Sequence, residues 1–352
     1  MEWAHRILGR TIGLAFVLPL CYFALQRRLS RSLRAPLLSL AALLGAQGVL
    51  GWYMVQSGLE PANFSADGAV PRVSQYRLAA HLGAALVLYA GMFAAALAVK
   101  ADWRFARQGA WGGRLSDGRT WEEVLRNPIV RRFKRHAAIV TGLVLFTAFS
   151  GTRNNTPPSL FFKKISNSLL LLLFFFLFWV TKGAFVAGLD AGLLYNEFPL
   201  MGGRLAPPLN ELLSPHYATS PIPAPTTTTT HHDSTGLWRN LFENPTTVQF
   251  DHRVLAMTTY IATALLFASS RRAAARAVLP PSALRSATSL FAMANVQVLL
   301  GISTLLYLVP VPLAAAHQAG SVALLTAALH VLLALRRPGA AALAWRKAKL
   351  AR

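Results

Sequence analysis

The stretch HRILGRTIGLAFVLPLCYFALQRR, residues 5–28, decides the fold class. A histidine and an arginine open an apolar run that two arginines close, and the run approaches the ~20 residues that a helix needs to cross a bilayer. Comparable runs lie near residues 35–55, 78–99, 254–270, 287–309 and 314–335, and another lies within 137–190. Because 54% of all residues are apolar and only 14% are charged, the chain is predicted to be an all-α polytopic membrane protein.

The net charge of +22 is concentrated in alternate connections between the apolar runs. Basic residues gather in the connections at 27–34, 100–135, 271–285 and 336–352. The intervening connections, at 56–76, 190–250 and 310–316, hold almost none. This alternation is the positive-inside pattern of a membrane protein. Attraction to anionic membrane lipid explains the basic side, and a nucleic-acid-binding surface is not expected.

The charge pattern places four histidines, His5, His81, His252 and His317, near the outer ends of spans that run inward. One such histidine alone is explained equally well as a hydrogen-bonding group between helices. Four at one depth favour function, because an ionisable group inside a membrane is costly. Two imidazoles that face each other in a helical bundle form a bis-axial haem site. Zinc is disfavoured, since no cysteine or further histidine completes a tetrahedral set.

The chain also contains a tandem repeat of membrane helices. Residues 5–28 resemble 252–272, GAQGVLGWYMVQSGL at 45–59 resembles NVQVLLGISTLLYLV at 295–309, and residues 77–90 resemble 313–326. Equal order and orientation predict two halves packed about a pseudo-twofold axis along the membrane normal. The pairs His5–His81 and His252–His317 then predict two haems. The second copy follows an extra span, so we expect the first bundle to lack its N-terminal helix in this chain.

A resemblance to the haem A synthase family, in its mitochondrial form, is carried by six segments: EWAHRILGR, GAQGVLGWYMVQSGL, VSQYRLAAHL, GAFVAGLDAGLLYNEFPLMGGRLAPP, QFDHRVLA and AAAHQAGS. The resemblance implies an eight-span protein of two pseudo-symmetric four-helix bundles in the mitochondrial inner membrane. Its histidine sites would lie toward the intermembrane space and its basic loops toward the matrix. It also implies oxidation of the C8 methyl group of haem O to the formyl group of haem A, for use in cytochrome c oxidase.

Ligands and partners follow from the same resemblance. Haem O as substrate is assigned to the axial ligands His5 and His81, and a haem b cofactor to His252 and His317. The expected partners are haem O, membrane lipid and an electron-transfer protein. A ferredoxin-like protein is a candidate for the electron-transfer protein. Haem O synthase or oxidase assembly factors are further candidates.

A contrast between the two halves points to the chemistry. Glu2 stands three residues before His5, on one helix face, and Gln249 stands three residues before His252. A carboxylate near the edge of the macrocycle can accept a proton, or hold a water, as a methyl group is oxidised. An amide cannot act as a base, so Glu2 is the predicted catalytic residue. The alternative is a glutamate that only stabilises the first turn of a helix.

Two arginines adjoin the predicted iron ligands. Arg6 and Arg253 are candidates to bind haem propionates, and anchoring of the helix ends explains them equally well. Two other functions remain open: a di-haem membrane cytochrome b that carries electrons without oxidising a methyl group, and a transporter whose histidines relay protons.

The expected organisation has six parts. They are an N-terminal bundle at 1–100, a basic matrix-side loop at 101–135, a fifth span at 136–190, an outer loop at 191–250, a C-terminal bundle at 251–335 and a basic tail at 336–352. Residues 152–182 match nothing in the family, and their removal leaves one clean span. We therefore expect an aberrant insertion there, such as a retained intron.

Overall fold

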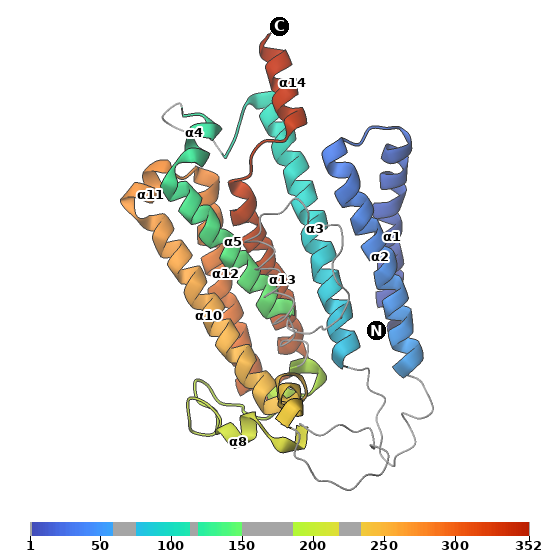
Figure 1. Ribbon diagram of the computed structural model, residues 1–352, viewed down its shortest axis with the longest axis vertical. Helices are drawn as coiled ribbons and strands as arrows, with labels where there is room; N and C mark the ends of the chain where they lie inside the picture. The colour runs from blue at the N-terminus through green and yellow to red at the C-terminus, as the bar shows by residue number, and fades with distance from the viewer. Residues whose placement is uncertain (1, 59–74, 113–118, 150–185, 218–233, 352) are drawn as a thin grey trace.

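The computed structural model describes residues 2–58, 75–112, 119–149, 186–217 and 234–351 (Figure 1). These residues form helices and short helical turns, and within them the β-type pairing is an isolated bridge between Met201 and Arg204. The prediction of an all-α chain is therefore confirmed. The predicted insertion at 152–182 lies outside the described residues.

Long helices dominate the described part of the chain. They are α1 (Glu2–Leu25), α2 (Arg31–Gly58), α3 (Gln75–Gln108), α5 (Pro128–Phe149), α10 (Pro245–Arg271), α12 (Pro281–Leu306) and α13 (Val311–Ala334). All of these except α5 are long and apolar enough to cross a membrane, and they coincide with the predicted apolar runs. Helix α5 carries the start of the run predicted within 137–190, after the basic residues Arg131, Arg132, Lys134 and Arg135 in its first two turns.

Short elements make up the rest of the helical structure in the described residues. They are α4 (Trp121–Arg126), η2 (Ala191–Leu193), α8 (Leu209–Leu212), η3 (Pro215–Tyr217), η4 (Ser234–Arg239), α9 (Asn240–Glu243), α11 (Ala273–Val278) and α14 (Ala340–Leu350). Residues 191–217 and 234–243 form a cap at the end of the bundle where α10 begins (Figure 1).

Helices α1, α3, α10 and α13 all begin at the lower end of the bundle in Figure 1. The connections rich in arginine and lysine lie at the opposite end, where α1 joins α2 and where α14 follows α13. Since the four histidines occur within the first eight residues of their helices, they are gathered at one end of the molecule.

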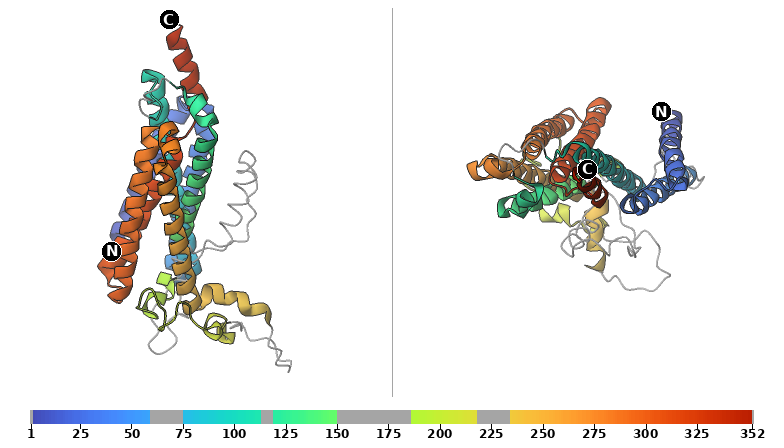
Figure 2. Two further views of the ribbon diagram at one scale, coloured as in Figure 1. Left: turned by 90° about the vertical axis from the view of Figure 1, so that its left-hand side faces the viewer. Right: turned by 90° about the horizontal axis from the view of Figure 1, so that it is seen from above.

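The second half is the more tightly packed part. Helix α12 packs against α13, and α5 packs against both α10 and α13. Their buried residues form one cluster, which Leu86 of α3 joins. Helix α2 packs on α3 and α1 packs on α2, so this pair lies at one side of the molecule (Figure 2).

Polar contacts tie α3 to the second half at three levels. Asp102 pairs with both terminal nitrogens of Arg336, at 2.7 and 3.1 Å, and also accepts a hydrogen bond from the Gly339 amide at 2.9 Å. The Tyr89 hydroxyl lies 2.6 Å from that of Thr326 midway along the helices. At the histidine end, the Tyr76 hydroxyl donates to Glu243 at 2.7 Å.

Several predicted boundaries differ from the structure because polar residues extend or start helices. Helix α3 continues past residue 100 to Gln108, and a capping box between Thr120 and Glu123 starts α4 within the predicted basic loop. Helix α10 starts inside the predicted outer loop, because the Asn244 side chain caps it and Pro245 suits its first turn. The predicted basic tail contains helix α14.

Candidate functional site

His5 and His81 face each other across α1 and α3. Their ring centroids lie 6.4 Å apart, with the rings inclined at 57°. An imidazole nitrogen binds a metal at about 2 Å, so two imidazoles on opposite sides of one metal have centroids about 6 Å apart once each ring radius is added. The observed separation therefore fits a single iron between the two rings.

His252 of α10 and His317 of α13 form the second pair. The two side chains lie within electrostatic range of each other. The Nδ1 atoms of His252 and of His81 are buried and have no hydrogen-bond partner among the described residues. Buried polar atoms without a partner are uncommon, and they mark places where a bound group or water completes the bonding.

A glutamine on a neighbouring helix contacts one histidine of each pair in the same way. Gln47 of α2 donates from Nε2 to the His81 carbonyl at 2.9 Å. Gln297 of α12 donates from Nε2 to the His317 carbonyl at 3.0 Å and lies 3.2 Å from its Nδ1 atom. Each hydrogen bond joins two helices, so it sets the depth and rotation at which the histidine is presented.

A glycine four residues after each glutamine makes room for the imidazole. A Cβ atom placed on Gly51 would lie 3.3 Å from Cε1 of His81, and one placed on Gly301 would lie 2.9 Å from Cε1 of His317. The second distance is too short for an ordinary contact. Alanine at 301 would therefore force His317 or its helix to move.

We predict that Gly301→Ala weakens the bond between His317 and a haem iron. Overpacking of this kind typically costs about 1–3 kcal/mol, enough to convert part of a low-spin bis-histidine spectrum to a high-spin one. The measurement is the absorbance and electron paramagnetic resonance spectrum of purified protein. The matched control is Gly48→Ala in α2, where an added Cβ meets nothing within 4 Å. An unchanged spectrum in Gly301→Ala would contradict this role.

The cap is anchored over the start of α10 by two side chains near His252. Arg253 donates from its terminal nitrogens to the carbonyls of Leu200, at 2.9 Å, and Tyr195, at 2.8 Å. Gln249 donates to the same Tyr195 carbonyl at 3.0 Å and is buried. The contacts of Arg253 thus match the anchoring alternative, and its role toward a propionate stays a prediction.

Within the cap, the Tyr195 side chain contacts α8. Its hydroxyl donates to the carboxylate of Glu211. This hydrogen bond, together with burial and the charge of Glu211, raises the pKa of Tyr195 to about 12. The phenol therefore stays protonated at physiological pH and acts as a hydrogen-bond donor that holds α8 against the segment before it.

Glu2 is the first residue of α1, one turn before His5, as the sequence predicted. Gln249 stands at the corresponding place before His252, and its side chain donates a hydrogen bond to the Tyr195 carbonyl in the cap. Arg6 is exposed next to His5, and its role stays a prediction. His330, on the same helix as His317, instead packs edge-on against Phe93.

Sequence reasoning found the histidines but assigned no role to the residues that position them. The signal was present: both glutamine-containing spans carry the spacing Q-x-x-x-G, at Gln47–Gly51 and Gln297–Gly301. The contacts of Arg253 with Leu200 and Tyr195 had no comparable signal, because they join segments more than fifty residues apart.

The donor set suits haem better than a bare metal ion. Within the part of the chain that the structure describes, no three His, Cys, Asp or Glu side chains come together to hold a metal. A haem iron already has four porphyrin nitrogens, so it needs only two axial imidazoles from the protein. Each pair of histidines supplies two.

The sequence matches the COX15-CtaA family, described as cytochrome oxidase assembly protein, over residues 1–156 and 137–329. The chain is 42% identical over 337 residues to heme A synthase COX15 of Bos taurus, covering 96% of this chain and 63% of that protein. It is 39% identical over 336 residues to heme A synthase of Nitrosospira multiformis, covering 96% of this chain and 71% of that protein.

A third relative is the heme A synthase-mitochondrial ferredoxin fusion protein of Schizosaccharomyces pombe, 40% identical over 334 residues, which cover 94% of this chain and 46% of that protein. The chain thus spans less than two thirds of the length of the bovine relative and about half of the fusion protein. The match nevertheless extends over nearly the whole of this chain and includes both histidine pairs. The chain therefore belongs to the COX15-CtaA family of cytochrome oxidase assembly proteins.

Proposed function

We propose that this protein is a haem A synthase, which oxidises the C8 methyl group of haem O to the formyl group of haem A. The observation that carries the proposal is the 6.4 Å separation of the His5 and His81 rings in a chain of this family. Glu2 begins the same helix one turn before His5. Its relatives are named heme A synthases.

In this proposal, haem O is the substrate and lies between His5 and His81. With water as the source of the oxygen atom, conversion of the methyl to the formyl group releases four protons and four electrons, so the reaction requires the electron-transfer partner as an acceptor. Glu2, near the edge of the macrocycle, accepts a proton or holds the water that supplies the oxygen. Arg6 binds a propionate at the outer end of α1.

The second pair, His252 and His317, holds a haem b cofactor. Bound there, haem b supplies one-electron transfer. The protein's own part is to exclude water and fix the ligands: the cap anchored by Arg253 covers the end of the site, and Gln297 orients His317. The common placement of Gln47 and Gln297 supports two halves related by an internal repeat.

The proposed location is the mitochondrial inner membrane, with the histidine end toward the intermembrane space and the basic connections toward the matrix. The grouping of basic connections at one end of the bundle supports this orientation. The relative that is named as a fusion with mitochondrial ferredoxin supports a ferredoxin-like protein as the electron-transfer partner.

Chromatography of extracted pigment tests the proposal. We expect cells that make haem O and express this protein in its full length to accumulate haem A. A di-haem electron carrier would return haem b and leave haem O unchanged, and a proton-relay transporter would purify without a Soret band. Either outcome would overturn the proposed activity.

A further inference from the structure

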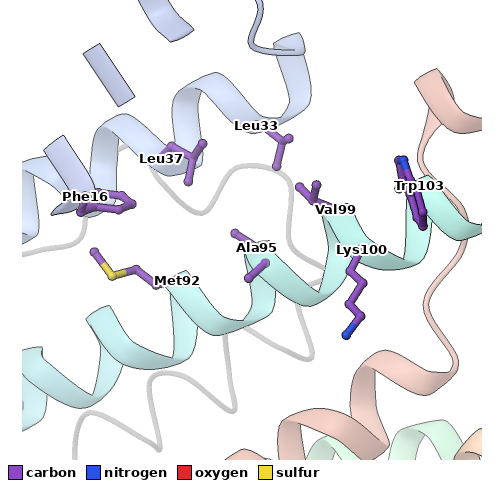
Figure 3. A pocket seen from close by; sticks show the side chains of 9 residues that line it. Phe16, Leu33, Leu37, Met92, Ala95, Val99, Lys100 and Trp103 are labelled. Carbon is purple, nitrogen blue, oxygen red and sulfur yellow. The ribbon is translucent and has the colours of Figure 1, made fainter. Parts of the chain in front are cut away.

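An apolar groove of about 700 Å³ lies between α1, α2 and α3. Its walls are formed by Phe16 of α1, by Leu33 and Leu37 of α2, and by a row of α3 residues: Met92, Ala95, Ala96, Val99, Lys100 and Trp103. The side chains of Phe16 and Leu37 face Met92 and Ala95 across the groove (Figure 3).

The groove follows the same helix faces that present His5 and His81. Phe16 comes eleven residues after His5, and Met92 comes eleven residues after His81. Eleven residues are close to three turns, so each residue lies within about 20° of its histidine around the helix and about 16 Å further along it. Val99, eighteen residues after His81, returns to the same face again.

The lining selects an uncharged, elongated occupant. Lys100 is the only charged residue among the lining residues, and its ammonium points away from Leu33 and Leu37 (Figure 3). Such a surface can bury a hydrocarbon chain away from water, but it has no group that could pair with a charge on the occupant.

The proposed substrate has a matching shape. In haem O the propionates leave one edge of the macrocycle and a hydroxyethylfarnesyl tail leaves the opposite region. With the iron at the level of His5, close to the start of α1, the propionates reach the aqueous end of the helices. The tail must then extend inward along the faces of α1 and α3.

We propose that this groove binds the farnesyl tail of haem O, an inference that rests on the proposed function of the His5–His81 site. The tail sets the in-plane rotation of the macrocycle as well as its affinity. Because the C8 methyl neighbours a propionate-bearing carbon, this rotation places the methyl toward the outer end of α1, where Glu2 begins the helix.

The test compares haem O with haem B, which lacks the tail, in titrations of the full-length protein that already holds haem b in its second site. The change in the Soret band reports binding to the first site. We expect haem O to bind at least about tenfold more tightly than haem B, the order expected for burial of a substantial apolar chain. Ala95→Trp, which fills the groove, should remove most of this preference and leave haem B binding nearly unchanged.

Two further variants keep the test interpretable. Ala95→Leu fills the groove less and should reduce the preference for haem O in part, which guards against misfolding of the tryptophan variant. Val87→Trp adds the same bulk to an exposed position of α3 and should change neither affinity.

Equal affinities for haem O and haem B in the unaltered protein, or an unaltered preference in both Ala95 variants, would overturn the assignment of the groove and leave the haem site in place. A lipid or another protein segment in the groove would give this result. Failure of both haems to give a bis-histidine spectrum at the first site would instead overturn the proposed function, and the groove assignment with it.

Discussion

Glutamine in place of Glu2 should lower the rate of haem A formation by about 10²–10⁴-fold, the usual cost of losing a general base. The amide nearly preserves the shape of the side chain, so ligation of iron by His5 and His81 should persist. Haem O should therefore accumulate, together with partly oxidised intermediate. The measurement is chromatography of haem extracted from cells that express the full-length protein, normalised to the amount of protein.

Gln249→Ala is the matched control in the second half. Its amide donates to the Tyr195 carbonyl, so its loss should cost about 1 kcal/mol of stability, as is typical for one hydrogen bond. Haem A formed per folded molecule should change little, because this half only passes electrons. Normal haem A in Glu2→Gln, or an equal loss in both variants, would leave Glu2 as a residue that stabilises the helix start.

Alanine in place of His252 or His317 should remove the haem b signal from the purified protein. Each substitution deletes one of the two protein ligands, and a cofactor bound by a single imidazole is held too weakly to survive purification. The His5–His81 site should still bind added haem, since separate sites behave independently. The measurement is the Soret absorbance per protein before and after addition of haem.

His330→Ala provides the control on the same helix. His330 packs against the Phe93 ring and lies thirteen residues after His317 on the same helix, so its loss should leave the haem b spectrum unchanged. A purified His252→Ala variant that retains the original bis-histidine spectrum would refute the assignment of the second pair. Loss of both haems in every histidine variant, including His330→Ala, would indicate unfolding instead.

The sequence alone was sufficient to predict where the long helices lie and at which end of the bundle the histidines are found. A helix that crosses a bilayer must be apolar over a fixed length, and the basic residues avoid one side, so both signals are local in the chain. The runs around 5–28 and 252–272 could therefore be placed without any knowledge of what they touch. Helix ends set by single polar residues, such as Asn244 before α10, were less visible.

The details of each site depend on tertiary structure. The 6.4 Å distance between the His5 and His81 rings depends on the translation and rotation of α1, α2 and α3 relative to one another. An apolar helix surface does not by itself fix that translation and rotation. The contact of Gln47 with the His81 carbonyl, and the space above Gly51 and Gly301, restrict them. The groove below the first pair arises in the same way, because its walls come from three helices whose facing residues meet only after packing.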